Sequence, residues 1–324
     1  MYWLVLAISI IIAVVSSNIL IKGSIALGHR FNIPAYIIGA IVIGFGSSLP
    51  EFSVNISAAL NKQTDLAIGN ILGSNLFNIC FSLGLISLIQ PLSIAKNSKL
   101  KDVPMHLIAV IIIAVCGNQL YLDGIQFHEI MPSHGIILLS FFTIYLYYTL
   151  LEVFDQSPHK QQLHQQHHQA IKDPEDLSLF KITLFIILGL IGLVAGGEMI
   201  VESAKHIALS MGISNKLVGL LIIGPGTSLP ELIACISALR HKNTDMVIGN
   251  VIGSNLFNIF LTLGITSLIT PIPFDLALNK VLIFYLTLSL LLCLFFWFNK
   301  KAVLNRPFSA FLFASYAVYL YLCF

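Results

Sequence analysis

Long runs of apolar residues, separated by short polar connections, occupy most of the chain. Ten of these runs have the length, about 20 residues, that an α-helix needs to cross a bilayer. They lie at 2–21, 33–60, 65–90, 104–122, 133–152, 179–202, 213–239, 245–270, 280–298 and 306–323. The pattern predicts an all-α integral membrane protein with ten transmembrane helices.

The composition agrees with this pattern. The chain is 57% hydrophobic and 10% charged, with a mean hydropathy of +0.90, which lies far outside the range of soluble globular proteins. No basic residue precedes the first apolar run, and it has no small-residue cleavage site, so we expect it to be a retained helix. The five cysteines are scattered through apolar runs and indicate neither a disulfide framework nor a metal site. A net charge of +2 indicates no nucleic-acid partner.

One hydrophilic stretch of some length, 154–178, interrupts the apolar runs. It is rich in histidine and glutamine, and we interpret it as a linker between a first half, 1–153, and a second half, 179–324. When alternate connections are assigned to opposite sides of the membrane, 13 of the 17 lysines and arginines fall on the side of the linker. The positive-inside rule therefore predicts a multi-pass protein of the cell (inner) membrane, with a cytoplasmic linker and both termini outside.

The two halves contain the same sequence. At a shift of 180 residues, 27 of the 46 positions in 44–89 are identical to those in 224–269. Similarity of this degree indicates duplication. Because each half contains an odd number of spans, the copies enter the membrane from opposite sides, which predicts two inverted five-helix repeats.

The repeated segment begins with Gly-Phe-Gly-Ser-Ser-Leu-Pro-Glu at 44–51 and Gly-Pro-Gly-Thr-Ser-Leu-Pro-Glu at 224–231. The prolines lack an N–H group, so the carbonyls of Gly46 and Gly226 lose their helical donors. We therefore expect the second and seventh helices to be broken. Irregular backbone at membrane depth is tolerated only where it is buried in protein or lines a cavity.

Each copy also places a glutamate, Glu51 or Glu231, near the middle of an apolar run. An acidic residue there costs about 2.5–3.5 kcal/mol on insertion scales, so it indicates a functional site. Hydroxyl groups precede both glutamates, on Ser47, Ser48, Thr227 and Ser228. In the next span, polar residues recur every four positions and share one helix face; they are Asn70, Ser74 and Asn78, and then Asn250, Ser254 and Asn258.

The potential ligands are therefore all oxygen atoms. Carboxylates, hydroxyls, amides and free carbonyls suit a hard cation such as calcium, which takes six to eight oxygen ligands. Two carboxylates give the site a formal charge of up to −2. One divalent ion or a comparable load of monovalent ions matches that charge, and competition between the two predicts exchange.

The paired motifs resemble the two α-repeats, here 44–79 and 224–259, of the calcium:cation antiporter superfamily, in particular a compact, prokaryotic-type member of its sodium/calcium exchanger branch. The resemblance covers essentially the whole chain. It implies that Glu51 and Glu231 bind calcium and share sodium sites with the neighbouring oxygen ligands. Those ligands would be the side chains of Ser47, Ser48, Ser74, Asn78, Thr227, Ser228, Ser254 and Asn258, and backbone carbonyls at Gly44 and Gly224.

The resemblance also implies a mechanism. In this family the first and sixth helices slide past the other eight to alternate access, and about three sodium ions exchange for each calcium ion. We accordingly expect calcium extrusion by a monomeric functional unit in the lipid bilayer, with calcium and sodium as substrates and no cofactor.

Three positions depart from the family pattern. Asn258 stands where some exchangers, including the potassium-dependent ones, have aspartate; this argues against potassium dependence and leaves open sodium or proton coupling. Pro225 replaces a small or aliphatic residue, and Ser47 replaces threonine but keeps the hydroxyl.

Other interpretations remain. The same fold exchanges divalent cations for protons in some relatives, although those carry Gly-Asn-x-x-Glu around the acidic residue. An intramembrane hydrolase with Ser48 or Ser228 as nucleophile needs a nearby base, and neither motif-bearing span contains histidine. A passive cation channel is a further alternative. The two glutamates would have only a structural role if they hydrogen-bonded neighbouring helices, and we expect Asn75 and Asn255 to join helices rather than bind ions.

Overall fold

The computed structural model describes residues 2–62, 67–119, 128–154, 177–212, 224–299 and 301–322. Most of the predicted linker, 155–176, and the first part of the predicted seventh span, 213–223, lie outside the described residues. Within the described ranges the chain is helical apart from two pairs of two-residue strands. The prediction of an all-helical fold is confirmed.

Contacts group the chain into two compact units, each built from both predicted halves. The first unit comprises residues 1–47 and 146–251, and the second comprises 48–145 and 252–324. The halves describe sequence duplication and the units describe spatial contacts, so the two divisions report different properties. Two helices contribute to both units, α9 (Pro132–Phe154) and α15 (Thr244–Leu256).

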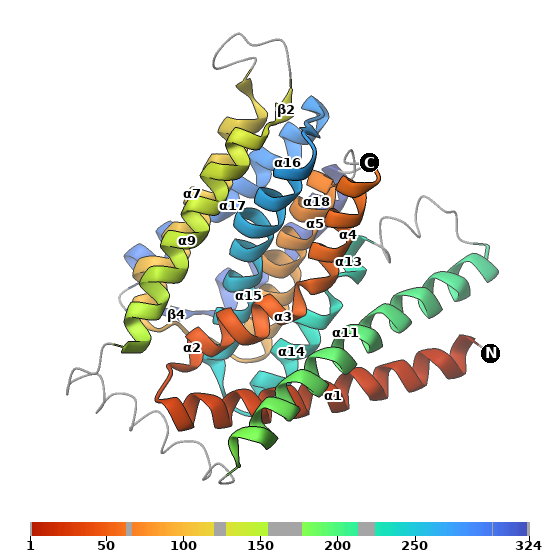
Figure 1. Cartoon of the computed structure of the whole chain (residues 1–324), viewed down its shortest axis with the longest axis vertical. Coiled ribbons are helices and arrows are strands. Elements are labelled where there is room, and N and C mark those ends of the chain that lie inside the picture. The colour runs from red at the N-terminus through yellow and green to blue at the C-terminus, as the bar shows by residue number, and fades with distance from the viewer. Residues whose placement is uncertain are drawn as a thin grey trace. The chain divides into compact units, whose positions relative to one another are not determined.

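The other helices of the first unit are α1 (Tyr2–Phe31), α2 (Ala35–Ile37), the π-helical segment η1 (Ile38–Gly44), α3 (Phe45–Ser47), α11 (Leu179–Ser210), α13 (Gly224–Gly226) and α14 (Leu229–Arg240). Here α1, red in Figure 1, and α11, green, lie side by side. Small residues allow this approach, since a Cβ added at Gly189 would lie 2.7 Å from the backbone nitrogen of Leu20, and one at Gly196 would lie 2.9 Å from that of Ala13. Glycine is used in this way where membrane helices pack closely.

A second close crossing in this unit joins α15 to the segment 35–44. A Cβ added at Gly39 would lie 2.5 Å from the carbonyl oxygen of Met246, and one at Gly249 would overlap the carbonyl oxygen of Tyr36. Each backbone therefore presents a glycine to the other. The crossing holds the segment just before the first motif against the helix that carries Asn250.

The helices of the second unit are α4 (Leu49–Leu60), α5 (Ala67–Leu76), η3 (Phe77–Leu83), α6 (Gly84–Ile89), η4 (Ser98–Asp102), α7 (Val103–Gly117), η6 (Phe257–Leu263), α16 (Gly264–Ile269), η7 (Leu276–Leu278), α17 (Asn279–Phe298) and α18 (Arg306–Leu322). Here α7 packs on α17, while α18 packs on η3 and α6. The two side-chain amides of Asn118 and Asn279 donate to each other's oxygens over 2.9 and 2.7 Å, which joins one end of α7 to α17.

Short strands join connections between helices in this unit. Strand β1 (Leu92–Ser93) pairs with β4 (Val303–Leu304), and β2 (Glu129–Ile130) pairs with β3 (Ile272–Pro273), both antiparallel. Such short pairs carry too little periodicity to be predicted from sequence. They satisfy backbone groups where the chain leaves its helices.

The helices of the duplicated segment change pitch at equivalent positions. The π-helical segments η3 and η6 begin at Phe77 and Phe257, which are 180 residues apart. Short π-helical insertions are rare and frequently occur at functional sites. They lie within the two helices on which Asn78 and Asn258 were predicted to be ligands.

Seven described helices are long and apolar enough to cross a membrane, or eight if the bent pair Ala35–Ser47 and Leu49–Leu60 is one span. The seven are Tyr2–Phe31, Ala67–Ile89, Ser98–Gly117, Pro132–Phe154, Leu179–Ser210, Thr244–Ile269 and Leu276–Phe298. Of the remaining predicted spans, α18 has 17 residues and the seventh is described only from Gly224. Ten spans and their inverted arrangement stay predictions.

The substitution Gly249→Ala tests the glycine crossing. The new methyl group would meet the Tyr36 backbone, which cannot rotate away, so we expect a loss of about 1–3 kcal/mol in the free energy of unfolding. Thermal unfolding in detergent measures this. Gly73→Ala is the matched control, because its Cβ would meet only the hydroxyl end of the Tyr319 side chain, at 3.1 Å. Equal stability of both variants would contradict the rigid crossing.

Candidate functional site

Both copies of the repeated motif interrupt a helix and start a new one. Ser48 (φ −86°, ψ 9°) separates α3 from α4, and Ser228 (φ −93°, ψ 7°) precedes α14. Proline follows as the second residue of each new helix, where its missing N–H costs no hydrogen bond. The carbonyl of Ser48 accepts from the backbone of Phe52 over 3.1 Å, so the helical pattern resumes at once. The proline therefore begins a helix.

This restart determines where the glutamates lie. Glu51 and Glu231 occupy the first turns of α4 and α14, and both are fully buried. The N-terminal turn of a helix stabilises negative charge through its oriented N–H groups. The backbone carbonyl of each glutamate accepts a hydrogen bond from a buried asparagine. Nδ2 of Asn55 donates to Glu51 over 2.8 Å, and Nδ2 of Asn250 donates to Glu231 over 3.1 Å. Both carboxylates therefore belong to protein-enclosed, braced turns.

In the first unit, Asn250 connects several predicted ligands. Its Oδ1 lies 3.4 Å from the Ser47 hydroxyl that donates to it, and that hydroxyl also lies 3.4 Å from the carbonyl oxygen of Gly44. Its Nδ2 donates to Glu231 and approaches the Cys235 sulfur at 3.1 Å. Asn250 thus links residues from both motif copies. The four-residue spacing predicted that Asn250 shares a helix face with Ser254 and Asn258, but it did not reveal this link.

In the second unit, Asn75 and Asn255 form a reciprocal pair across α5 and α15. Nδ2 of Asn75 donates to the backbone carbonyl of Asn255 over 3.3 Å, and Nδ2 of Asn255 donates to that of Asn75 over 3.2 Å. The two residues join helices, as the sequence analysis predicted. Their amide oxygens therefore turn the other way and are available as acceptors.

Those oxygens orient two predicted ligands. Nδ2 of Asn78 donates to Oδ1 of Asn255 over 3.1 Å, and Nδ2 of Asn258 donates to Oδ1 of Asn75 over 3.0 Å. Because both nitrogens are engaged, the orientation of each amide is defined by its hydrogen bonds. Oδ1 of Asn78 and Oδ1 of Asn258 are then left fully buried, without a hydrogen-bond partner in the described part of the chain.

A buried amide oxygen without a partner costs about 1–3 kcal/mol, so structures rarely keep one without a reason. Here two occur at repeat-related positions on the helices η3 and η6. A bound cation or its water would satisfy both oxygens. The donor chemistry is that of a hard-cation ligand and fits the predicted site.

The other predicted ligands lie in the two motif copies and in the helices that lead into η3 and η6. Ser74 and Ser254 are fully buried one turn before Asn78 and Asn258, Ser48 and Ser228 are fully buried at the helix restarts, and Thr227 is partly exposed. Gly224 begins α13. The structure thus joins Gly44, Ser47 and Glu231 through Asn250, and Asn78 and Asn258 through the Asn75–Asn255 pair.

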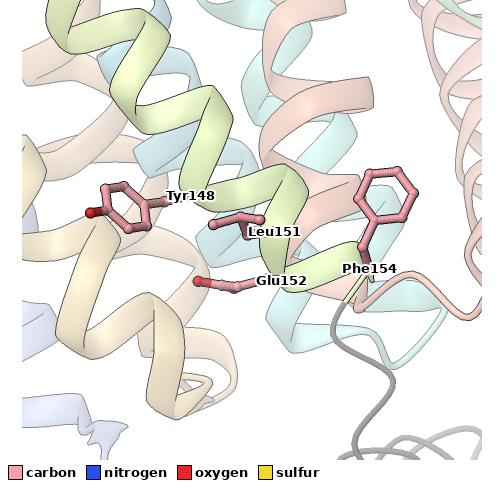
Figure 2. A pocket seen from close by; sticks show the side chains of 4 residues that line it. All are labelled: Tyr148, Leu151, Glu152 and Phe154. Atoms are coloured by element: carbon pink, nitrogen blue, oxygen red, sulfur yellow. The ribbon is translucent and has the colours of Figure 1, made fainter.

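A surface pocket lies apart from these residues. It lies at the C-terminal end of α9, and Figure 2 shows the side chains that line it, those of Tyr148, Leu151, Glu152 and Phe154. The carboxylate of Glu152 accepts a hydrogen bond from the hydroxyl of Tyr36. The pocket contains none of the predicted cation ligands, so it is no part of the candidate site.

Fold and side chains together define a helical membrane protein with buried carboxylates just after duplicated helix breaks and buried amide oxygens on two repeat-related π-helical segments. Comparison with known proteins identifies its family. The sequence model of the sodium/calcium exchanger protein family matches residues 1–151 and 181–324. The chain belongs to this family, whose members are transporters and not enzymes.

Individual relatives and a solved structure agree with this family assignment. The chain is 33% identical to the inner membrane protein YrbG of Escherichia coli over 90% of this chain and 87% of that protein. It is 23% identical to the sodium/calcium exchanger MaX1 of Methanosarcina acetivorans over 90% of both. A structure of the sodium-calcium exchanger NCX_Mj, soaked with Na⁺ and Sr²⁺, superposes with a TM-score of 0.80 at 29% identity, covering 98% of this chain and 96% of that one.

The substitution Asn258→Asp tests the amide network. It replaces a nitrogen donor by an oxygen 3.0 Å from Oδ1 of Asn75, so two acceptors would face each other. We expect the free energy of unfolding without added cations to fall by about 1–3 kcal/mol. Asn61→Asp makes the same chemical change at the exposed C-terminal end of α4, where water replaces the lost bond and screens the new charge, so it should cost less stability than Asn258→Asp. An unchanged melting temperature for Asn258→Asp would contradict the network.

Proposed function

We propose that this protein is a secondary antiporter that exchanges sodium for calcium by alternating access and extrudes calcium. One observation carries the proposal: two fully buried glutamates start duplicated helices, in a chain of the exchanger family whose Asn78 and Asn258 oxygens have no hydrogen-bond partner within the described residues. Exchange requires a site that either ion can occupy but that is unfavourable when empty. Buried oxygens of this kind provide it.

The proposed ligands divide by charge. Glu51 and Glu231 supply negative charge for calcium, and the neutral oxygens complete the coordination of calcium or sodium. The neutral group comprises Ser47, Ser48, Ser74, Asn78, Thr227, Ser228, Ser254, Asn258 and the carbonyls of Gly44 and Gly224. Sodium and calcium both bind oxygen ligands, so the same residues can coordinate either ion.

The membrane potential bears on the stoichiometry. Moving the two charges of calcium outward against 100 mV costs about 4.6 kcal/mol, at about 2.3 per charge. Two entering sodium ions balance this charge, and a third makes the exchange electrogenic, so that the potential assists it. We therefore propose about three sodium ions per calcium ion.

The proposed architecture is ten spans in two inverted five-helix repeats, with both termini outside and the linker cytoplasmic. The duplication in the sequence and the distribution of lysine and arginine support it. The name of the related inner membrane protein YrbG supports an inner-membrane location. The close pairing of α1 with α11 supports their movement as one body, in a monomeric functional unit.

Calcium flux into sodium-loaded proteoliposomes tests the function. Isotopic calcium should enter wild-type vesicles when they are diluted into sodium-free buffer. Glu51→Gln and Glu231→Gln should each reduce uptake more than tenfold, because losing a carboxylate ligand costs more than the ~1.4 kcal/mol that a tenfold change represents.

Glu129→Gln is the control for that experiment. Glu129 lies in the short strand β2, outside the long helices, so its loss should leave uptake unchanged. Full uptake by both Gln variants would remove the site assignment. Equal uptake by wild type with and without the sodium gradient would favour a passive channel.

Proton coupling is the second candidate, and Asn258 favours testing it because some sodium-coupled relatives carry a carboxylate there. With pH clamped on both sides and a protonophore present, sodium-driven uptake should persist. An imposed proton gradient without sodium should drive none. The opposite pair of results would assign this chain to the proton-coupled exchangers.

A further inference from the structure

A second polar pair lies behind the asparagines of the second unit. His106 on α7 and Tyr285 on α17 are both fully buried. Nε2 of the histidine and the tyrosine hydroxyl are hydrogen-bonded over 2.7 Å, and the two rings meet edge to face. No ligand role in the proposed site requires either residue. Two buried polar side chains in a membrane protein nevertheless need a reason to be there.

The pair touches the asparagines that orient the ligands. Nδ2 of Asn255 lies 3.5 Å from the Tyr285 hydroxyl and 3.4 Å from Nε2 of His106. Asn255 is joined in turn to Asn75 by the two hydrogen bonds of their reciprocal pair. A continuous polar chain therefore leads from α7 and α17, through the asparagine pair, to Asn78 and Asn258.

The hydrogen-bond roles along this chain have a direction. A tyrosine hydroxyl that donates to Nε2 of His106 turns its lone pairs toward the hydrogens on Nδ2 of Asn255. Nδ2 of Asn255 then faces the pair, and Oδ1 of Asn255 faces Asn78. Acceptors behind the asparagines therefore favour the orientation in which the asparagine oxygens receive the ligand amides.

Reversal of this orientation would harm cation binding. If the amide of Asn255 rotated by half a turn, its NH₂ group would face the NH₂ group of Asn78. Two donors repel, so Asn78 would rotate as well and present hydrogens, instead of Oδ1, to the ion. Rotation of the Asn75 amide would in the same way turn its NH₂ group toward the NH₂ group of Asn258.

We propose that His106 and Tyr285 are positioning residues of the cation site, which keep the amide oxygens of Asn78 and Asn258 directed at the bound ion by holding Asn255 and Asn75. The inference rests on the proposed function, because it assigns a role at the same site. Neither residue contacts the ion. Each acts through the asparagines.

Thermal unfolding with cation titration separates affinity from stability. A ligand that binds only the folded protein raises its stability according to the ratio of ligand concentration to Kd. The melting temperature without cation therefore reports packing, and its rise with calcium or sodium chloride reports binding. The purified full chain is used in detergent, with Tyr285→Phe, His106→Leu and the double variant beside the wild type.

We expect the calcium and sodium concentrations at half-maximal stabilisation to rise about three- to tenfold in each single variant, the size of effect that the loss of one net hydrogen bond produces. The double variant should be at least as impaired as either single variant, because it removes both acceptors that lie near Nδ2 of Asn255. Unchanged concentrations in all three variants would overturn the inference.

The Asn118–Asn279 pair supplies a matched control. It joins the same two helices, α7 and α17, through two amide hydrogen bonds, and within the described residues it is hydrogen-bonded to neither Asn75 nor Asn255. Asn118→Leu should lower the melting temperature without cation and leave the half-maximal concentrations unchanged. If it weakens binding as much as His106→Leu does, the effect is one of helix packing and the inference fails.

A double-mutant cycle tests the route. In an Asn78→Ser, Asn258→Ser background, the ligand hydroxyls rotate freely and no longer depend on the asparagine pair. Adding Tyr285→Phe should then cause no further change in the half-maximal concentrations. An additive change would show that Tyr285 acts elsewhere.

The outcomes separate the inference from the proposed function. Cation stabilisation of the wild type without sodium-driven calcium flux would overturn the exchanger function and leave the positioning role to be decided by the variants. A wild type that no cation stabilises would overturn both. Stabilisation and flux in the wild type, with variants equal to it, would overturn the inference alone.

Discussion

The structure depends on the need to satisfy polar groups that are buried away from water. A carboxylate or amide in a dry interior is costly unless each of its atoms has a partner. Here the side-chain nitrogens of Asn75 and Asn255 donate to each other's backbone carbonyls. Their side-chain oxygens accept hydrogen bonds from the amides of Asn258 and Asn78. This leaves Oδ1 of Asn78 and Oδ1 of Asn258 buried without a hydrogen-bond partner among the described residues. Under the proposed function, a bound sodium or calcium ion would satisfy these oxygens.

Proline and glycine produce the helix breaks of both motif copies, where one helix ends and the next begins. The restart places Glu51 and Glu231 in first turns, where N–H groups point toward negative charge. Glycines in the same motif remove side chains where α11 passes, so that Leu190 packs over Gly46 and Val201 over Gly226. Close packing and charge stabilisation therefore come from one short sequence, and this accounts for its use in both copies.

The two motif copies are similar in sequence but are braced differently. Asn55 supports the carbonyl of Glu51 from within its own helix, whereas Cys235 stands at the equivalent position and Asn250 supports Glu231 from a neighbouring helix. Ser47 reaches the same Asn250. Duplication thus provides two similar halves, and local substitutions make their hydrogen bonds unequal.

The sequence by itself determined the helical membrane class, the duplication, the family and the helix breaks. Each follows from local chemistry: apolar length, identical residues at a fixed shift, and a proline that cannot donate. It also gave Asn75 and Asn255 their role in joining helices, but not their control of Asn78 and Asn258. That control, the Asn250 link and the contact of His106 with Tyr285 were decided only by the tertiary structure. Their physical reason is direction: spacing along a helix tells which residues share a face, whereas only the packed helices decide which atom of an amide meets which partner.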